Sequence, residues 1–291
     1  MPRGRGMSLL ERNSIGRDTR LCMSLSGRPG NAGSRLHNWL YGHYGLDCVY
    51  KSFSTSDIAA AVGGIRALGI RGCAVSMPFK EAVIPMLDGL AASARAIGSV
   101  NTIVNDDGVL TGYNTDYVAV RDLLTRRGID PAMPFLLRGS GGMAKAVIAA
   151  LRDSGFLRGT IIARNRQNGP ALAARYGFDW REDMPASGAP LLINVTPLGM
   201  EGVEADRLAF PAGQVEACDI AFDVVAQPAD TPFMRAAQAA GKMTISGAEV
   251  IVLQAIEQFV LYTGVRPDAK AVARAAAFAH GDEVAEKLRE A

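Results

Sequence analysis

The chain has 291 residues and a formal net charge of +2, and with 48% hydrophobic and 21% charged residues it is typical of a globular protein of one or two domains. So small a net charge gives no indication of a nucleic-acid partner, and no apolar run reaches the ~20 residues that a membrane span needs. The three histidines lack metal-ligand spacing and the four cysteines form no C-x-x-C pair, so we expect reduced thiols in a cytoplasmic protein and no metal site.

Strands and helices alternate in the first part of the chain. Residues 1–20 carry five arginines and no apolar signal segment, so we expect a poorly ordered lead-in, within which Met7 is a second possible start. Apolar runs then predict strands, and 3.6-residue periodicity predicts helices after Ser34, over 58–68 and from Pro78. The strands are expected at residues 21–25, 48–53 and 72–76. This order favours a largely parallel sheet.

A second α/β unit follows a hairpin. Residues 99–105 and 109–113 are expected to pair across Asp106-Asp107-Gly108, and Asn114-Thr115-Asp116 caps a helix over 117–127. The later strands are expected at 133–137, 160–163, 191–194 and 220–225. The later helices are expected up to about residue 154, at 170–176, 232–240 and 248–262, and after Pro267.

A glycine turn stands between the first strand and the first helix of this second unit. Gly139, Gly141 and Ala144 have the G-x-G-x-x-A spacing of a dinucleotide fingerprint. Gly139 forms the turn, Gly141 lets the backbone approach a pyrophosphate, and the free N–H groups of the helix start attract its charge. The turn therefore predicts a nicotinamide cofactor bound by Gly139, Ser140, Gly141, Gly142, Met143 and Ala144.

Arg164 indicates which cofactor is bound. In NAD-binding proteins with this fingerprint, an acidic residue about 20 positions after the glycines, at the end of the next strand, binds the ribose 2′-hydroxyl. This chain has Arg164 there, with Arg166 close behind and no acid. A guanidinium suits a 2′-phosphate, so the sequence favours NADP, although both arginines could also be solvated loop residues.

Lys80 and Asp116 are the candidates for proton transfer. Lys80 follows the strand over 72–76, at the edge of a parallel sheet where ligands collect, and Asp116 opens the helix that joins the two halves. A dehydrogenase needs a group that accepts the hydroxyl proton, which such a pair can do. Spacing alone leaves open a solvated lysine and a helix N-cap.

Several motifs together resemble the shikimate dehydrogenase family over about residues 21–263. The segment S-M-P-F-K-E at 76–81 is similar to the family's N-V-T-x-P-x-K-E, and G-S-V-N-T at 98–102 to G-A-V-N-T. G-Y-N-T-D at 112–116 is similar to G-x-N-T-D, and N-V-T-P-L-G-M at 194–200 to N-A-T-P-x-G-M.

The resemblance implies roles for particular residues. Lys80 and Asp116 would be the catalytic pair. Substrate contacts would come from Asn31, Gly33, Ser76, Asn101 and Gln254. Cofactor contacts beyond the glycine turn would come from Arg164, Asn165, Thr196, Val224 and Gly247.

The resemblance also implies fold and function. It implies an α/β protein with a discontinuous N-terminal substrate-binding domain (1–116 and 247–291) and a Rossmann-type NADP-binding domain (117–246). The expected enzyme interconverts shikimate and 3-dehydroshikimate in aromatic amino acid biosynthesis. We expect a shikimate-like small molecule as its partner, neither nucleic acid nor membrane, and a monomer or homodimer.

Departures from the family pattern concern the substrate. Counted back from His37-Asn38, the family's carboxylate-binding S-x-S becomes Asn31-Ala32-Gly33, while Ser24-Leu25-Ser26 lies out of register. Each lost hydrogen bond to a charge is worth roughly 1.5–3 kcal/mol. In addition, Tyr117 stands where the family usually has a glycine, Ala226 replaces the family's tyrosine, and the family's second basic position falls on Asn168.

These changes resemble the shikimate dehydrogenase-like branch of the family, so we expect weak turnover of shikimate. One alternative is a dehydrogenase for quinate or an aminoshikimate-type substrate. Another is a regulatory protein that binds the dinucleotide without catalysis, against which the retention of both Lys80 and Asp116 argues.

Overall fold

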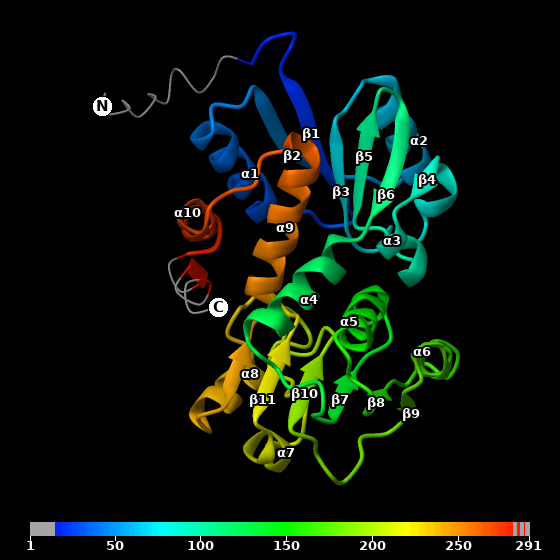
Figure 1. Ribbon diagram of the computed structural model, residues 1–291, viewed down its shortest axis with the longest axis vertical. Coiled ribbons are helices and arrows are strands. Elements are labelled where there is room, and N and C mark those ends of the chain that lie inside the picture. Colours follow the sequence, from blue (N-terminus) through cyan, green and yellow to red (C-terminus); the bar gives the residue numbers. More distant parts are fainter. Residues whose placement is uncertain (1–14, 282–283, 286–287, 289–291) are drawn as a thin grey trace.

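Two six-stranded sheets, one above the other in Figure 1, organise the protein. The computed structural model describes residues 15–281, 284, 285 and 288. Most of the expected lead-in, Met7 included, lies outside the described residues. Arg20, which we expected within the lead-in, is instead the first residue of a strand and pairs with Cys48.

The upper sheet, sheet A, has the order β2-β1-β3-β5-β6-β4. Its strands are β1 (Arg20–Ser26), β2 (Cys48–Ser54), β3 (Gly72–Val75), β4 (Gly89–Leu90), β5 (Thr102–Asp106) and β6 (Val109–Tyr113). Strand β1 is parallel to β2 and β3, whereas β5 and β6 form the expected antiparallel hairpin. Helix α2 (Ile58–Ala67) packs on one face, and α1 (Ala32–His43), α9 (Gly247–Thr263) and α10 (Ala269–His280) form the core on the other.

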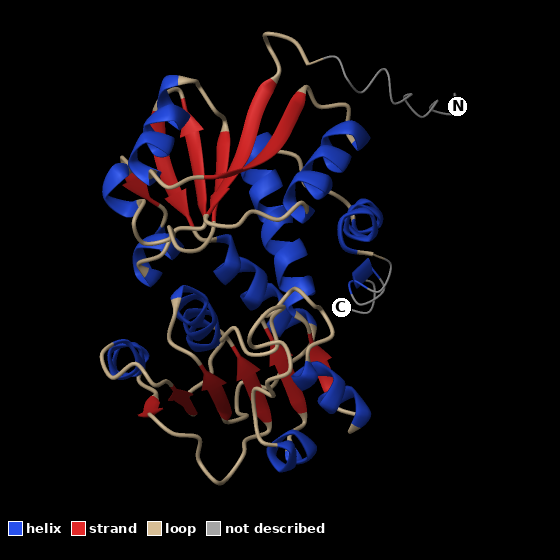
Figure 2. Ribbon diagram, turned by 180° about the vertical axis from the view of Figure 1, so that it is seen from behind, coloured by secondary structure: helices blue, strands red, loops and turns tan. Residues whose placement is uncertain are grey.

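The lower sheet, sheet B, is parallel throughout, with the order β12-β11-β10-β7-β8-β9. Its strands are β7 (Phe135–Arg138), β8 (Gly159–Ile162), β9 (Asp179–Arg181), β10 (Leu191–Asn194), β11 (Ile220–Asp223) and β12 (Met243–Ile245). Apolar residues of α5 (Gly142–Asp153) and α6 (Asn168–Tyr176) cover one face, and those of α7 (Ala212–Ala217) and α8 (Pro232–Ala239) cover the other (Figure 2). This is the doubly wound strand order of dinucleotide-binding sheets, so the expected α/β class is confirmed.

Two helices connect the sheets. Helix α4 (Thr115–Arg126) leads from sheet A to sheet B, and α9 returns the chain and packs along α4 (Figure 1). A buried ion pair joins them, since Arg127 Nη2 lies 2.5 Å from Glu249 Oε1. The chain thus leaves the first sheet and comes back to it, as a discontinuous first domain requires, while the boundaries at residues 116 and 247 stay a prediction.

Some expected elements differ in the structure. The helix expected from Pro78 is a series of turns followed by a short 3-10 helix, Ile84–Met86, because Pro85 has no backbone N–H and its ring would collide with the carbonyl of residue 81 in an α-helix. Helix α1 begins at Ala32, two residues before Ser34, so its first turn includes the altered loop. Five short elements were not expected from the sequence, and each has six residues or fewer: β4, α3 (Ala92–Ile97), β9, α7 and β12.

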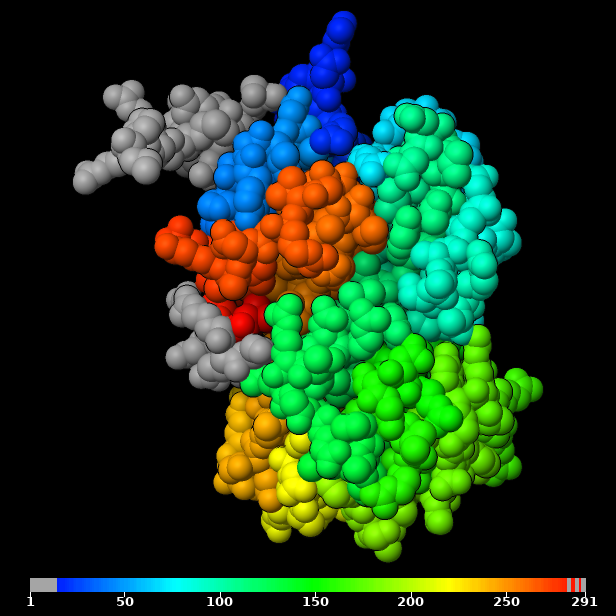
Figure 3. Space-filling model, viewed as in Figure 1, coloured from blue at the N-terminus to red at the C-terminus, as the bar shows by residue number. Residues whose placement is uncertain are grey.

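The space-filling view shows the two lobes in contact, with cyan residues of the first resting on green residues of the second (Figure 3). Within the described part of the chain, no helix is long and apolar enough to cross a membrane.

Candidate active site

Lys80 and Asp116 meet where the two lobes face each other. Lys80 lies in the turn after β3, and Asp116 lies in the first turn of α4. Lys80 Nζ is 2.5 Å from Asp116 Oδ2, and the two side chains are 17% and 9% exposed. The structure therefore brings together two residues that are 36 positions apart in the chain and that the sequence analysis had paired.

Backbone contacts fix both members of the pair. The carbonyl of Lys80 accepts from Val100 N, which ties the lysine turn to the segment before β5. Asn114 caps α4 by accepting from Tyr117 N at 3.0 Å, and its amide donates to Ser99 O. The carboxylate of Asp116 therefore sits at the positive end of a helix dipole, which stabilises its negative charge.

A polar cluster lies around Asn101 and Gln254, two of the expected substrate-binding residues. Asn101 Nδ2 donates to Thr115 Oγ1 at 2.9 Å and to Gln254 Oε1 at 3.4 Å. The amide of Gln258, one turn after Gln254, donates to Thr102 Oγ1 at 3.1 Å. Our sequence reasoning assigned no role to Thr115 or Gln258, although Thr115 stands inside the N-T-D motif and Gln258 follows Gln254 by one helical turn.

Asn31, Gly33 and Ser76 lie apart from this cluster's hydrogen bonds. Asn31 is the exposed N-cap residue of α1, and its side chain makes no capping hydrogen bond. Gly33 lies within the first turn of α1, where it offers no hydroxyl. Ser76 is exposed after β3, and its amide donates to Leu25 O at 2.9 Å.

The glycine turn has the geometry that a dinucleotide needs. Gly139 has a φ of +126°, and a Cβ there would lie 3.0 Å from Val195 O, so only glycine fits. Gly141, the N-cap residue of α5, has no side chain that could cap the helix. The first turn of α5 contains no acidic residue. Ala144 is fully buried against the sheet. Ser140, Gly142 and Met143 complete the turn, whose first-turn N–H groups suit an anionic group.

Arg164 and Asn165 follow β8 at the same edge of sheet B. Both are exposed, but the side-chain oxygen of Asn165 already accepts from Gln167 N and Asn168 N at 2.9 and 2.8 Å. Arg166 pairs with Glu182 at 2.8 Å. Arg164 is therefore the better placed of these residues for a 2′-phosphate.

Arg138, at the end of β7, is a further cation that the sequence analysis did not single out. Burial, and after it the neighbouring charges of Arg164 and Arg207, lower the pKa of Arg138. Its guanidinium donates to Ala209 O. Arg138 and Arg164 thus stand at the carboxyl ends of the adjacent strands β7 and β8, next to the glycine turn.

Thr196, Val224 and Gly247 come together after β10 and β11. Thr196 Oγ1 donates to Asn194 Oδ1 at 2.6 Å. A Cβ on Gly247, the first residue of α9, would lie 2.4 Å from Val224 O and from Val225 O, so only glycine allows the helix to begin there. These loops therefore pack tightly at the edge where the glycine turn lies.

Asp223, the last residue of β11, holds these loops. It is fully buried and accepts from Asn194 Nδ2, Val225 N and Thr231 Oγ1 at 3.0, 3.0 and 2.7 Å. Burial raises the pKa of Asp223 to about 6, against the opposing effect of these hydrogen bonds. The sequence analysis assigned it no role.

The first turn of α5 lies next to the Lys80–Asp116 pair. A Cβ on Gly142 would lie 3.7 Å from Ser99 Oγ and 3.9 Å from Lys80 Cδ. One turn further on, Lys145 Nζ is 2.8 Å from Glu81 Oε1. The expected cofactor-binding turn and the expected proton-transfer pair therefore occupy one site between the lobes.

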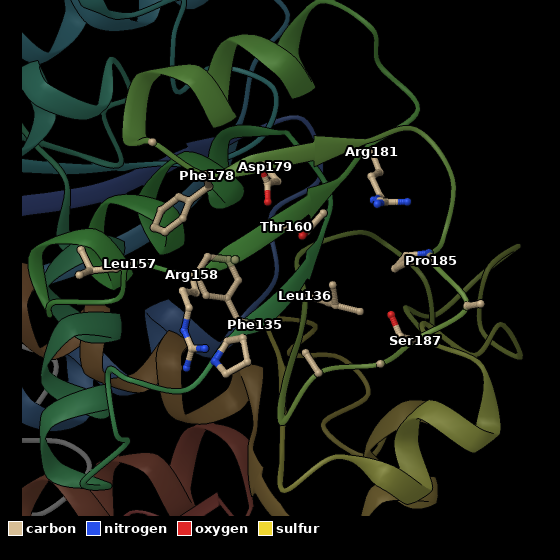
Figure 4. A pocket seen from close by; sticks show the side chains of 16 residues that line it. Phe135, Leu136, Leu157, Arg158, Thr160, Phe178, Asp179, Arg181, Pro185 and Ser187 are labelled. Carbon is tan, nitrogen blue, oxygen red and sulfur yellow. The ribbon is translucent and has the colours of Figure 1, made fainter.

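Another hollow lies elsewhere. A groove of about 830 Å³ runs along the amino-terminal ends of β7 to β9, between Phe178, Arg181 and Ser187 (Figure 4). It is at the opposite edge of sheet B from the glycine turn and contains none of the candidate site residues. The described residues also contain no group of three or more side chains suited to hold a metal ion.

Comparisons with known proteins agree with this geometry. The family described as "Shikimate dehydrogenase substrate binding domain" matches residues 32–103. A shikimate dehydrogenase-like protein of Haemophilus influenzae is 54% identical over 91% of this chain and 98% of its own length. A solved structure of a shikimate 5-dehydrogenase-like protein is 55% identical with a TM-score of 0.86, covering 91% of this chain and 99% of that one. The shikimate 5-dehydrogenase of Thermus thermophilus, solved with NADP(H) and shikimate, is 30% identical with a TM-score of 0.80, covering 89% and 99%.

Proposed function

The chain belongs to the shikimate dehydrogenase family, and we propose that it is an NADP-dependent oxidoreductase that interconverts shikimate, or a closely related hydroxy acid, and its 3-dehydro ketone. The observation that carries this proposal is the 2.5 Å contact of Lys80 with Asp116 beside the first turn of α5. A pair of titratable groups held next to a dinucleotide turn is what oxidation of an alcohol needs.

In the proposed reaction, Lys80 and Asp116 act on the proton of the substrate hydroxyl. The carboxylate of Asp116 orients the Lys80 amine, and the pair accepts the proton on oxidation and returns it on reduction. NADP, when bound, supplies the group that accepts or donates the hydride. Asn101 and Gln254 hold the neighbouring hydroxyl groups, which fixes the reacting carbon relative to the pair.

The cofactor would lie along the carboxyl edge of sheet B. Its pyrophosphate would face the N–H groups of α5, its 2′-phosphate would face Arg164, and its nicotinamide end would approach Thr196, Val224 and Gly247. The tight glycine positions 139 and 247 support this assignment, because a side chain at either one would collide with the neighbouring backbone.

Turnover of shikimate is expected to be weak. The chain lacks both serines of the family's carboxylate-binding S-x-S motif, and a relative at 54% identity is named a shikimate dehydrogenase-like protein. Catalytic chemistry and affinity for the substrate therefore depend on different parts of the site. The first depends on Lys80 and Asp116, and the second on the start of α1.

The remaining assignments follow from the same proposal. The substrate domain comprises residues 1–116 and 247–291, and the NADP domain comprises 117–246. The protein acts in the cytoplasm, a location supported by four cysteines that are all free in the structure. It acts on a small molecule, without nucleic acid or membrane, as a monomer or homodimer.

The test is a panel of initial rates with NADP and NAD over shikimate, quinate and an amino analogue, each run beside Lys80→Ala. NADP-dependent oxidation of shikimate that Lys80→Ala abolishes is the expected result. A higher rate with quinate or the amino analogue would assign the site to that substrate. Cofactor binding with no rate above Lys80→Ala would identify a regulatory binding protein instead.

A further inference from the structure

We infer, on the basis of the proposed function, that three serines outside the matched motifs bind the substrate's carboxylate: Ser26, Ser34 and Ser52. They are specificity-determining residues that take over from the altered Asn31–Gly33 loop. They come from the end of β1, the first turn of α1 and the middle of β2.

Hydrogen bonding and strand register place these serines on one face of sheet A. Ser34 Oγ lies 2.8 Å from Ser52 Oγ, so the Ser52 side chain points to the α1 side of the sheet. Ser24 pairs with Ser52 across the parallel strands, and paired residues share a face. Ser26 follows Ser24 by two positions, so its side chain points to the same side, at the carboxyl end of the strand.

Ser26 gives the independent sign of a ligand. Ser26 is only 7% exposed, and its Oγ has no hydrogen-bond partner in the described part of the chain. A buried hydroxyl without a partner is destabilising, and such groups are rare unless a ligand or water satisfies them. The unused hydroxyl is at the carboxyl end of β1, next to Ser76, whose amide bonds to Leu25 O.

The start of α1 indicates that this ligand is an anion. Its N-cap, Asn31, makes no side-chain capping bond, and its first turn has no acidic residue. The N–H groups of a helix start carry partial positive charge and attract anions. Hydroxyl donors beside such a helix start suit a carboxylate better than a cation or a neutral group.

The spacing across the sheet agrees with a ring-sized substrate. Ser24 pairs with Ala74, and Ala74 pairs with Thr102, which hydrogen-bonds to Asn101. Neighbouring strands lie ~4.8 Å apart, so the strand of Ser26 and the strand of Thr102 are separated by roughly 10 Å. One six-membered ring can therefore bring its carboxylate to Ser26 and its hydroxyls to the Asn101 cluster, while Ser34 and Ser52, one strand further along at β2, approach the carboxylate from its outer side.

The test compares shikimate with its neutral methyl ester. Ser34→Ala and Ser52→Ala should each raise KM for shikimate about tenfold with kcat little changed, and should leave KM for the ester unaltered. Ser34→Thr, which keeps the hydroxyl, should retain the wild-type KM, and so should the control Ser56→Ala in the exposed turn after β2. Unaltered KM values for shikimate, or equal increases for acid and ester, would overturn the inference.

Ser26→Ala gives a readout that a structural role cannot mimic. Removal of an unsatisfied buried hydroxyl should raise the melting temperature of the free protein while weakening shikimate binding. A fall in melting temperature with unchanged shikimate binding would assign Ser26 to the fold alone. Because binding is measured by calorimetry, these arms remain valid if the oxidation rate is zero, which would contradict the proposed function and not the carboxylate site.

Discussion

Lys80 Nζ and Asp116 Oδ2 lie 2.5 Å apart, although one belongs to a turn of sheet A and the other to the helix that leaves it. Val100 N holds the backbone of Lys80, and the Asn114 cap of α4 holds that of Asp116, so the pair is formed before any substrate arrives. A pair formed in advance lowers the entropic cost of reaching the transition state. Its loss should therefore affect the rate far more than binding.

Lys80→Met tests this directly. We expect kcat to fall about 10²- to 10⁴-fold, the usual contribution of a positioned acid–base group, while the dissociation constant for NADP stays within twofold of wild type. Steady-state kinetics and a fluorescence titration with NADPH measure the two quantities. Lys270→Met, at an exposed lysine of α10, is the control for loss of one positive charge. A kcat above one tenth of wild type would remove Lys80 from the chemistry.

Arg164→Ala tests the preference for NADP. Because a guanidinium–phosphate contact is charge-assisted, the dissociation constant for NADP should rise at least about tenfold while that for NAD barely changes. The matched control is Arg166→Ala, because Arg166 is exposed in the same loop but already pairs with Glu182. Equal losses for NADP and NAD would show that Arg164 does not read the 2′-phosphate.

The sequence predicted the fold wherever a local pattern was strong. The expected strand over 191–194 is β10 residue for residue, and the glycine turn lies between β7 and α5 as expected. The edge strands β9 and β12 were missed because three residues carry too short a pattern to recognise. The turn after β3 was wrongly expected to be a helix, since Pro78 suits the first position of a helix but Pro85 follows too soon for the helix to form.

The candidate site was predictable only in part, for a different reason. Motif resemblance identified Lys80, Asp116, Asn101 and Gln254, which the structure brings together. The contact of Ser34 with Ser52 depends instead on how α1 packs on β2, and no spacing in the sequence encodes that register. The uncapped start of α1 likewise depended on where the helix begins, at Ala32 and not after Ser34 as expected.

Gly33→Ser should increase affinity for shikimate. A Cβ at position 33 would meet only Tyr50 Cε1 and OH at 3.8 Å, which is ordinary contact, so the family's lost hydroxyl can be restored without strain. A new hydrogen bond to a carboxylate should lower KM for shikimate about tenfold or more. Gly30→Ser, in the same loop with no atoms within 4 Å of its Cβ position, is the control. An unchanged KM would mean that the carboxylate lies elsewhere.

Glu249→Gln tests the ion pair between α4 and α9. The substitution preserves shape but removes the negative charge that faces the Arg127 guanidinium and weakens the acceptor of Ser246 N and Ser246 Oγ in the cap of α9, so the free energy of unfolding should fall by about 3 kcal/mol. Glu257→Gln is the matched control on the same helix, because Glu257 pairs with the exposed Arg266 and should cost less than about 1 kcal/mol. Urea denaturation at neutral pH measures both. Equal losses would mean that burial of the pair contributes nothing.

Asp223 should make stability depend on pH in an unusual direction for a carboxylate. Burial raises its pKa in the folded protein to about 6 from the ordinary value of 3.8, so between these values the folded state holds a proton that the unfolded state has released. The stabilising contribution of Asp223 is therefore present below about pH 4 and is lost as the pH rises through 6, by up to about 1.4 kcal/mol per pH unit.

The measurement that isolates this effect is the free energy of unfolding of the wild type minus that of Asp223→Asn, taken from pH 4 to pH 7. Asparagine does not titrate, so the difference reports on Asp223 alone and should decrease from pH 4 to about pH 6 and level off above that pH. The three donors on the carboxylate, Asn194, Val225 and Thr231, favour the charged form and oppose the effect of burial. A difference that increases with pH would mean that these hydrogen bonds outweigh desolvation, and that Asp223 is charged while it holds the loops around Thr196 and Val224.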